Sequence, residues 1–257
     1  MSKLFQTSIK ENKKAAENHY ILTLAPLEKI TKSLPGQFFM LSAGKGMDPL
    51  LKRPFSTFRR SGKNFQILYR VVGKATAMLR EKKIGDTIEV LGPLGNGFPK
   101  LKPRTTPIFV AGGVGVVPLF SLAEEMAGKK PLFFLGARNK NELLCIKELK
   151  AIGIKPVIAT DNGSAGMKGT VIDILRKFFT HNASRVTHHV LYACGPKPML
   201  KELSSLAQKF RIDAYAAFEE NMACGMGACL GCVINTTEGF KRVCKDGPVF
   251  PLREIVW

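Results

Sequence analysis

Residues 107–127, PIFVAGGVGVVPLFSLAEEMA, decide how the second half of the chain folds. An apolar run leads into three closely spaced glycines, and a longer, largely apolar run follows them. This pattern predicts a buried strand, a tight turn and a helix. Residues 131–138 (PLFFLGAR) and 155–160 (KPVIAT) read as further strands, and residues 186–210 as a strand that leads into another helix. Such alternation favours a parallel sheet with crossover helices.

The first hundred residues have a different texture. They hold short strand-like runs bounded by Gly, Pro, Asn or Lys, and only residues 74–83 carry a helical pattern. The runs are HYILTLAP (19–26), GQFFMLSA (36–43), NFQILYRVV (64–72) and DTIEVLGPLG (86–95). They predict a small antiparallel barrel, and the prolines of GFPKLKPRTTP (97–107) indicate a linker after it.

The fold class expected from these patterns is a β barrel plus an α/β domain. We predict an antiparallel barrel over residues 1–101, a Rossmann-like parallel-sheet domain over 102–214 and a small C-terminal domain over 215–257. With 257 residues, of which 45% are hydrophobic, the chain is long enough for such compact domains.

Composition and charge restrict the functions to consider. The sequence has no apolar run of about 18 residues, and its N-terminus lacks the apolar core of a signal peptide, so we expect a soluble, cytoplasmic protein without a membrane partner. Lys and Arg number 39 against 20 Asp and Glu, a net charge of +19, but the lysines are scattered. We interpret the charge as a solvated surface, with an acidic partner or anionic cofactors as the alternative, and expect no nucleic acid to bind.

A cysteine cluster marks the C-terminal segment. In MACGMGACLGC (222–232), Cys224, Cys229 and Cys232 are separated by four and then two residues, and Cys244 follows after eleven more. Thiolates at this spacing match the plant-type ligand set of a 2Fe–2S cluster, and the small residues between them let backbone amides approach the sulfides. The alternative is a structural four-cysteine zinc site, although zinc knuckles usually pair two short hairpins and only one such spacing occurs here.

Two turns at strand ends form a candidate nicotinamide site, because ligands of parallel sheets bind at the carboxyl ends of the strands. The spacing of the glycines in the first turn is not the Rossmann spacing, so a simple tight turn is the alternative. An aspartate after the strand at 155–160 is placed to accept a ribose hydroxyl or to form a turn. The candidate residues are Gly112, Gly113, Gly115, Cys194, Gly195, Pro196 and Asp161.

These residues resemble the ferredoxin–NADP reductase superfamily. The motifs that carry the resemblance are RPFS (53–56), PGQF (35–38), GGVGVVPL (112–119) and CGPKPM (194–199). Residues 219–232 and 243–250, together with TDNGSAGMKGTV (160–171), are similar to the electron-transfer subunits of NAD-linked dihydroorotate dehydrogenases. The resemblance covers essentially the whole chain, and it implies a flavin-binding barrel, an NAD-binding domain and a 2Fe–2S domain.

The resemblance also implies an FAD site on the barrel. Arg53 would hold the pyrophosphate with its guanidinium fork, and Ser56 would hydrogen-bond near the reactive nitrogen of the flavin. Tyr69 would stack on the flavin, while Thr76 and nearby backbone amides would bind phosphate in a turn where Ala75 replaces a common glycine. The ordinary alternatives are a surface ion pair for the arginine and strand packing for the tyrosine. The implied FAD residues are Arg53, Pro54, Phe55, Ser56, Leu68, Tyr69, Arg70, Ala75 and Thr76.

The implied function is an electron relay of pyrimidine biosynthesis. FAD would exchange a hydride with NAD and single electrons with the cluster, which would communicate with the FMN of a dihydroorotate dehydrogenase catalytic subunit. The implied assembly is a heterotetramer of two copies of each chain. Nothing in this chain resembles a dihydroorotate site, so we expect none of its residues to be catalytic in that oxidation.

Two alternatives remain open at this point. The nearer is the small subunit of an NADPH-dependent ferredoxin oxidoreductase or of a sulfide dehydrogenase, for which Arg138 or Lys168 would bind a 2′-phosphate. The other is a zinc-stapled basic module that binds nucleic acid. It accounts for the charge and the cysteines but leaves RPFS and the glycine turns unexplained.

Overall fold

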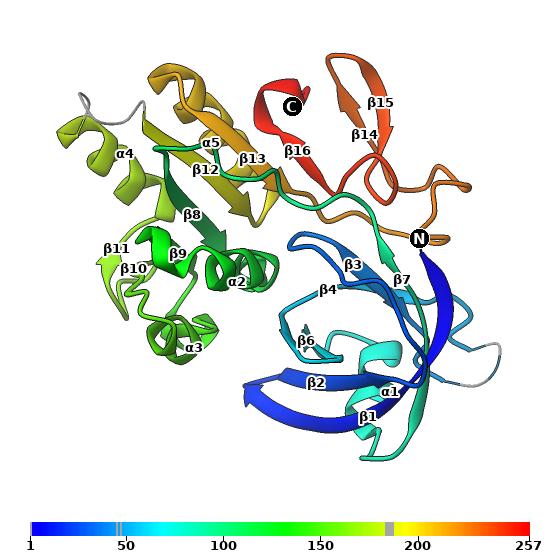
Figure 1. Ribbon diagram of the computed structural model, residues 1–257. Coiled ribbons are helices and arrows are strands. Elements are labelled where there is room, and N and C mark those ends of the chain that lie inside the picture. Colours follow the sequence, from blue (N-terminus) through cyan, green and yellow to red (C-terminus); the bar gives the residue numbers. More distant parts are fainter. Residues whose placement is uncertain (1, 45, 47, 183–187) are drawn as a thin grey trace. The chain divides into compact units, whose positions relative to one another are not determined.

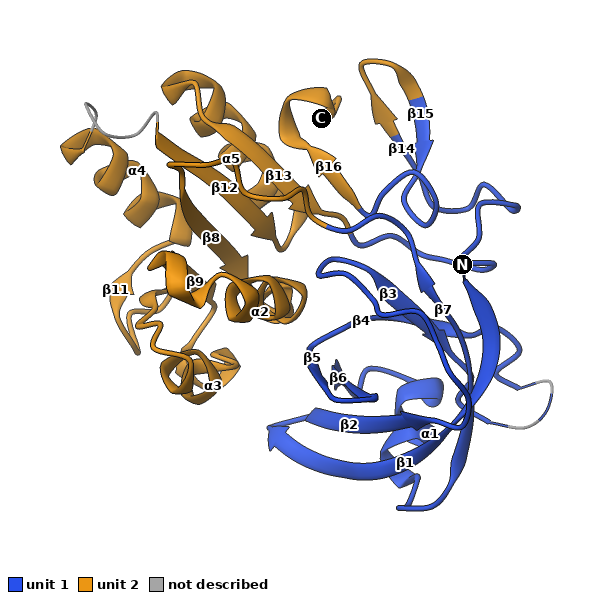
Figure 2. Ribbon diagram, viewed as in Figure 1, with its two compact units in different colours: residues 1–97, 219–234, 240–248 blue, residues 98–218, 235–239, 249–257 orange. Residues whose placement is uncertain are grey.

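The computed structural model describes residues 2–44, 46, 48–182 and 188–257, and its contacts divide the chain into two compact units (Figure 2). The half-barrel unit comprises residues 1–97, 219–234 and 240–248, and the parallel-sheet unit comprises residues 98–218, 235–239 and 249–257. The chain passes from one unit to the other at the start of the expected linker. The C-terminal segment contributes to both units, and the three-domain boundaries stay predictions.

The half-barrel unit is built on a curved, seven-stranded antiparallel sheet with the order β4-β3-β7-β1-β2-β6-β5 (Figure 1). Every second residue at the start of β1, namely Phe5, Thr7 and Ile9, is buried, as expected for a strand with one face on a core. Inside the sheet the rings of Phe39 and Phe65 stack with centroids 4.3 Å apart. The elements are β1 (Lys3–Ala16), β2 (His19–Pro26), β3 (Phe38–Leu41), β4 (Arg53–Ser56), β5 (Arg59–Ser61), β6 (Asn64–Arg70), α1 (Lys74–Glu81) and β7 (Thr87–Leu94).

The parallel-sheet unit has the strand order β11-β10-β9-β8-β12-β13-β16. All neighbouring strands are parallel except β16, which pairs with β13 in the antiparallel sense. The central strands β8 and β12 are almost entirely buried, which is the near-continuous apolar pattern of a sheet covered on both faces. The strands are β8 (Thr106–Gly112), β9 (Leu132–Ala137), β10 (Val157–Thr160), β11 (Met167–Lys168), β12 (His189–Cys194), β13 (Asp213–Ala217) and β16 (Val249–Pro251).

Four α-helices cover this sheet (Figure 1). They are α2 (Val116–Glu125), α3 (Ile146–Ala151), α4 (Val171–His181) and α5 (Lys197–Phe210). Helices α4 and α5 pack against each other on one face of the sheet, and α2 covers the other face. Thr170 begins α4 with a reciprocal capping box, because its hydroxyl accepts from the N–H of Asp173 while that carboxylate accepts from the N–H of Thr170. The expected β barrel plus α/β fold class is confirmed, with the barrel present as a half-barrel.

The cysteine-bearing segment completes the chain. Strands β14 (Val233–Thr236) and β15 (Gly239–Arg242) form a two-stranded hairpin, and Cys244 follows it. No helix in the described part of the chain is long and apolar enough to cross a membrane.

Candidate functional site

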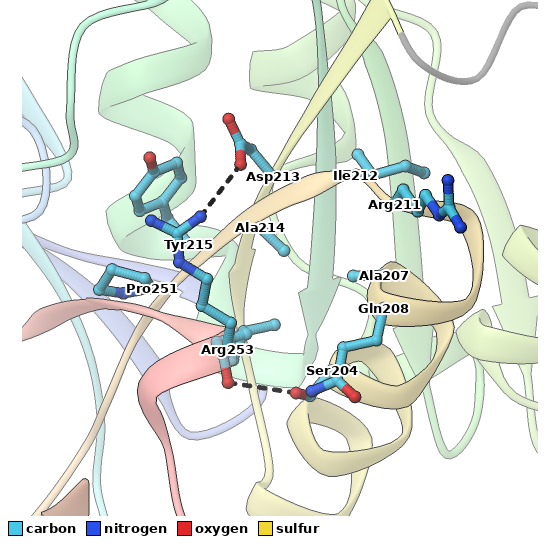
Figure 3. Close-up of a pocket in the computed structure, with 11 residues that line it drawn as sticks. Ser204, Ala207, Gln208, Arg211, Ile212, Asp213, Ala214, Tyr215, Pro251 and Arg253 are labelled. Atoms are coloured by element: carbon cyan, nitrogen blue, oxygen red, sulfur yellow. Dashed lines mark hydrogen bonds and ion pairs between the residues drawn. The ribbon is translucent and has the colours of Figure 1, made fainter. Parts of the chain in front are cut away.

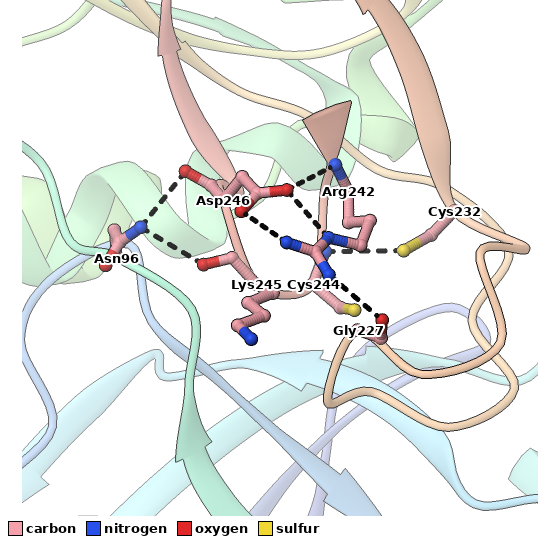
Figure 4. Close-up of polar contacts among 7 residues, drawn as sticks. All are labelled: Asn96, Gly227, Cys232, Arg242, Cys244, Lys245 and Asp246. Carbon is pink, nitrogen blue, oxygen red and sulfur yellow. Dashed lines mark hydrogen bonds and ion pairs between the residues drawn. The ribbon is translucent and has the colours of Figure 1, made fainter. Parts of the chain in front are cut away.

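The four clustered cysteines all belong to the half-barrel unit. Three lie on the irregular loop 222–232, and Cys244 lies on the turn after β15. Cys229 is exposed, whereas Cys232 and Cys244 are each only 2% exposed. Cys224 interacts with Cys229, and Cys244 interacts with both Cys232 and Cys224. The backbone N–H of Cys244 donates to Cys232 Sγ at 3.4 Å (Figure 4).

The four thiols are the ligand type that iron–sulfur clusters use. Among the described residues, no group of three or more His, Cys, Asp or Glu side chains is gathered closely enough to hold a single metal ion.

Backbone N–H groups also favour the thiolate form at one of the sulfurs. Burial by itself raises the pKa of Cys224, but backbone hydrogen bonds from Cys229, Met226 and Ala228 outweigh it and lower the pKa to about 6. The Met226 N to Cys224 Sγ distance is 3.5 Å. At Cys244, burial and then the neighbouring thiol raise the pKa to about 12. Because thiolates bind iron, the amide-rich loop is chemically suited to a cluster.

Two glycines let the cysteine loop lie directly against the half-barrel. A Cβ on Gly225 would fall 2.7 Å from Met40 Cγ on β3 and 3.3 Å from Leu94 Cδ1 on β7. A Cβ on Gly227 would fall 2.7 Å from Lys245 Cδ. Both glycines have positive φ, +70° and +86°, which other residues rarely adopt. Gly225 therefore allows the loop to approach the sheet, and Gly227 allows it to approach the turn that carries Cys244.

The RPFS motif forms β4, an edge strand of the half-barrel, and all four of its residues are partly exposed. Met40 of β3 pairs with Pro54 of β4, so one strand separates the cysteine loop from this motif. The guanidinium of Arg53 is exposed and donates to the carbonyl of Leu51 at 2.6 Å. An edge strand with an exposed arginine is accessible to an anionic cofactor.

Of the three expected flavin residues on β6, Tyr69 points into the half-barrel. It is 1% exposed, its hydroxyl donates to Asn12 Oδ1 at 3.3 Å, and its ring meets Phe55 edge-on at 5.9 Å. Burial raises its pKa to about 12. Its place is that of an ordinary strand residue, and a contact of its ring with flavin stays a prediction. Leu68 and Arg70 lie on the opposite face of β6, as alternation requires.

Thr76 uses its hydroxyl to cap α1. The oxygen accepts from two backbone N–H groups before the helix, at 2.9 and 3.1 Å, and its hydrogen goes to the carbonyl of Gly73. Phosphate binding at this turn would therefore fall to the backbone N–H groups of the first helical turn rather than to the hydroxyl. Ala75 is buried here, and Lys74 forms an ion pair with Asp48 in the segment that leads to β4.

The two predicted nicotinamide turns, 112–115 and 194–196, lie side by side in the parallel-sheet unit. They follow β8 and β12, which are neighbours in the sheet, and the chain proceeds outward from them in opposite directions. This is a topological switch point, the place where open α/β sheets bind their ligands. A Cβ on Gly195 would lie 3.1 Å from Gly112 Cα, so the backbones themselves are in contact.

Close packing explains two of the three glycines in the first turn. A Cβ on Gly115 would fall 2.1 Å from the carbonyl oxygen of Cys194, and one on Gly112 would fall 2.8 Å from Pro196 Cδ. Gly113 differs, because its φ is +55° and a Cβ there would have no neighbour within 4 Å. The carbonyl of Gly113 accepts a hydrogen bond from the N–H of Val116.

The ends of the neighbouring strands β9 and β10 carry a carboxylate-bound arginine and an aspartate. Asp161 follows β10, and its N–H donates to the carbonyl of Ala137 at 3.1 Å. Nearby, Arg138 forms a fork with Glu142, with Nε–Oε2 at 2.9 Å and Nη2–Oε1 at 2.6 Å. The Glu142 hydrogen bond, followed by its charge, raises the pKa of Arg138, and Asp161 adds to the shift. The arginine considered for a 2′-phosphate is therefore already engaged.

A hollow of about 260 Å³ lies elsewhere on the parallel-sheet unit (Figure 3). It is formed at the end of α5 and the start of β13, the edge opposite the glycine turns, and is separate from the predicted nucleotide site. Arg253 reaches Asp213 at 3.6 Å, and Ser204 Oγ donates to the carbonyl of Leu252 at 3.1 Å.

Sequence reasoning missed the polar groups that surround the cysteines. Arg242 and Asp246 form an ion pair, and the side chain of Asn96 is bonded to the same turn (Figure 4). The sequence did offer one signal for this ion pair: Arg242 and Asp246 are opposite charges four residues apart, on either side of Cys244. The part played by Asn96 had no local signal, because it lies about 150 residues from its partners.

The folds of the two units, with paired glycine turns at a switch point and a cysteine loop on the half-barrel, define an iron–sulfur oxidoreductase with a ferredoxin reductase-like fold. Residues 219–256 match the iron–sulfur cluster binding domain of dihydroorotate dehydrogenase B, and residues 109–205 match the oxidoreductase NAD-binding domain. The chain belongs to the family of the electron transfer subunits of dihydroorotate dehydrogenase B (NAD(+)).

Similarity to individual proteins extends over the whole chain. The electron transfer subunit from Desulforamulus reducens is 36% identical over 265 residues and covers 100% of both chains, and that from Bacillus caldolyticus is 41% identical and covers 94% of both. Among solved structures, the NADH-dependent reduced ferredoxin-NADP oxidoreductase is similar with a TM-score of 0.84 and 30% identity, covering 98% of this chain and 90% of that one. These matches confirm the predicted family and function, and the match to an iron–sulfur cluster binding domain speaks against the alternative of a zinc-stapled module.

Proposed function

We propose that this chain carries electrons between NAD and an FMN-containing dihydroorotate dehydrogenase catalytic subunit, through FAD on the half-barrel and a 2Fe–2S cluster. When bound, FAD supplies the exchange of electron pairs with NAD and of single electrons with the cluster. The observation that carries the proposal is the packing of the cysteine loop on β3, next to the RPFS strand. One unit thereby holds both candidate sites a single strand apart.

The residues of the half-barrel have separate tasks in this proposal. Arg53 and the backbone N–H groups at the start of α1 bind the diphosphate of FAD, since both suit an anion. The ion pair between Lys74 and Asp48 links the start of α1 to the segment before β4. Ser56, partly exposed on the same edge strand, hydrogen-bonds the flavin. Cys224, Cys229, Cys232 and Cys244 hold the two irons of the cluster.

The parallel-sheet unit binds the dinucleotide at its switch point. Gly112 and Gly115 bring the two turns together, and Gly113, where a Cβ would have no neighbour within 4 Å, leaves room for the dinucleotide. Glu142 forms an ion pair with Arg138 and, together with Asp161, makes the surroundings of the carboxyl ends of β9 and β10 unfavourable to a 2′-phosphate. This arrangement supports NAD over NADP as the partner nucleotide.

Oxidation of dihydroorotate is assigned to the partner chain. We propose a heterotetramer with two copies of each chain, located in the cytoplasm. Light scattering of the co-expressed complex tests the stoichiometry, because a heterodimer has half the expected mass.

The decisive test is the visible spectrum of the anaerobically purified chain, together with its iron, sulfide and flavin contents. We expect equal amounts of iron and acid-labile sulfide, and flavin and cluster bands that bleach with NADH more readily than with NADPH. Preferential bleaching by NADPH would contradict the assigned nucleotide. A colourless protein that contains zinc and no iron after anaerobic reconstitution would contradict the cluster.

A further inference from the structure

Arg242 and Asp246, which form an ion pair, flank Cys244 in the sequence. Cys244 is the cysteine that lies furthest along the chain from the other three. Arg242 Nε lies 2.9 Å from Asp246 Oδ2, and Nη2 lies 3.1 Å from Oδ1, so the carboxylate is held by a fork (Figure 4). The backbone N–H of Arg242 adds a third hydrogen bond to Oδ2 at 2.8 Å. Both side chains are 30% exposed, which limits screening by water compared with a fully exposed pair.

The same guanidinium reaches the other cysteine segment. Nη1 of Arg242 donates to the carbonyl oxygen of Gly227 at 3.3 Å, within the loop that carries the first three cysteines. This hydrogen bond joins the turn that carries Cys244 to the loop of the other three cysteines.

The turn that carries Cys244 is fastened to the half-barrel. The side-chain amide of Asn96 donates to the carbonyls of Lys245 and Asp246 at 3.2 and 3.0 Å, and its backbone N–H donates to the carbonyl of Gly247 at 2.6 Å. The ion pair is therefore built into a fixed turn rather than carried on a free surface. Its charge has a defined position relative to the sulfurs, and it interacts electrostatically with both Cys232 and Cys244.

We propose that Arg242, oriented by Asp246, is a positioning residue that joins the two cysteine segments and raises the reduction potential of the cluster. The inference rests on the proposed function, because it requires a cluster on these four cysteines. Reduction adds a negative charge to the cluster, so a fixed positive charge beside the sulfurs of Cys232 and Cys244 stabilises the reduced form. Asp246 opposes part of this effect while fixing the fork.

The charge at this position predicts shifts of opposite sign for its two members. Arg242→Gln removes the positive charge and should lower the potential, by on the order of tenfold in the one-electron equilibrium or about 59 mV. Asp246→Asn removes the negative charge that partly neutralises Arg242, so it should raise the reduction potential of the cluster. Arg242→Lys keeps the charge without the fork, so its potential should stay closer to the wild-type value. The matched control is Lys13→Gln on β1, which also removes an ion-paired cation.

The experiment is an anaerobic redox titration of the complex with its catalytic partner, followed by electron paramagnetic resonance of the reduced cluster. Iron and sulfide contents are measured on each variant. Opposite shifts in Arg242→Gln and Asp246→Asn, with no shift in Lys13→Gln, support the inference. The inference is overturned if the two variants shift the potential in the same direction, as a general loosening of the loop would. It is also overturned if neither variant shifts the potential more than Lys13→Gln does.

The inference can still be tested if one of the variants fails to fold or to bind the cluster. If Arg242→Gln retains no cluster, Arg242→Lys and Asp246→Asn decide, and an unchanged or lowered potential in Asp246→Asn overturns the inference. Failure of the proposed function looks different, because the wild-type complex itself would then lack iron and the resonance signal.

Discussion

Replacing Gly115 by alanine should force apart the two turns at the switch point. The new Cβ would start 2.1 Å from the carbonyl oxygen of Cys194 and 2.4 Å from its carbon, so the first contact must lengthen by about 0.9 Å to reach 3.0 Å. Both partners are backbone, and β8 and β12 are buried strands that cannot yield by rotating a side chain. Overpacking of this kind costs about 1–3 kcal/mol, and we expect the upper end because no flexible group absorbs it.

Gly113→Ala is the matched control in the same turn. It meets no atom within 4 Å, and only its φ of +55° opposes the substitution, at a cost of roughly 1 kcal/mol. Urea unfolding should therefore show a much larger loss of stability for Gly115→Ala. NADH oxidation with an artificial acceptor gives the functional readout, since a displacement of about 1 Å near the reacting groups can cost about a hundredfold in rate.

The reasoning fails if the two alanine variants lose equal stability. It also fails if Gly115→Ala keeps the wild-type KM for NADH and the wild-type unfolding midpoint. A raised KM for NADH in Gly113→Ala, with a stability loss no larger than about 1 kcal/mol, would support Gly113 as a dinucleotide contact.

Three further predictions concern the cluster, the nucleotide and alkaline pH. Cys229→Ser should lose the iron–sulfur absorption while NADH still reduces the flavin, and loss of flavin reduction in the folded variant would contradict the order of the relay. Glu142→Gln should free Arg138 and raise kcat/KM for NADPH relative to NADH by about tenfold, whereas an unchanged ratio in steady-state assays would remove Glu142 from nucleotide selection. The pKa of Tyr69 rises from 10.0 to about 12 in the folded chain, so its contribution to stability is full below pH 10 and is lost as pH rises through about 12. Tyr69→Phe should weaken this decline in urea unfolding between pH 10 and 12, and an identical decline would assign it to other groups.

The strands with a clear apolar pattern could be predicted from the sequence. The run at 19–26 coincides with β2, and the stretch 107–127 contains β8 and α2 as expected. The longest strand, β1, was missed because its second half is rich in exposed lysines and its apolar alternation ends near Ile9. Strand β4 was recognised only as a motif, since a proline inside it reads as a break and is tolerated because β4 is an edge strand.

The candidate site was predictable where local spacing carries the chemistry. Four cysteines at a characteristic spacing point to a cluster without any tertiary information. The environment of those cysteines depends on contacts such as Asn96 with Asp246, which no local pattern reveals. Tyr69 could not be assigned a role from the sequence. Alternation along β6 predicts that one face of the strand is interior, but it does not say which face contacts a cofactor.

The path of the chain between the two units has a consequence for biosynthesis. The half-barrel unit takes residues 1–97 from the start of the chain and residues 219–234 and 240–248 from near its end. During translation, the early strands must therefore wait for more than a hundred later residues before the cysteine loop covers β3 and β7. With Cys244 as a cluster ligand, as proposed, iron delivery can be completed only after this residue has left the ribosome. Nascent chains that stall earlier expose apolar surface of the half-barrel and unligated thiols to chaperones and oxidants.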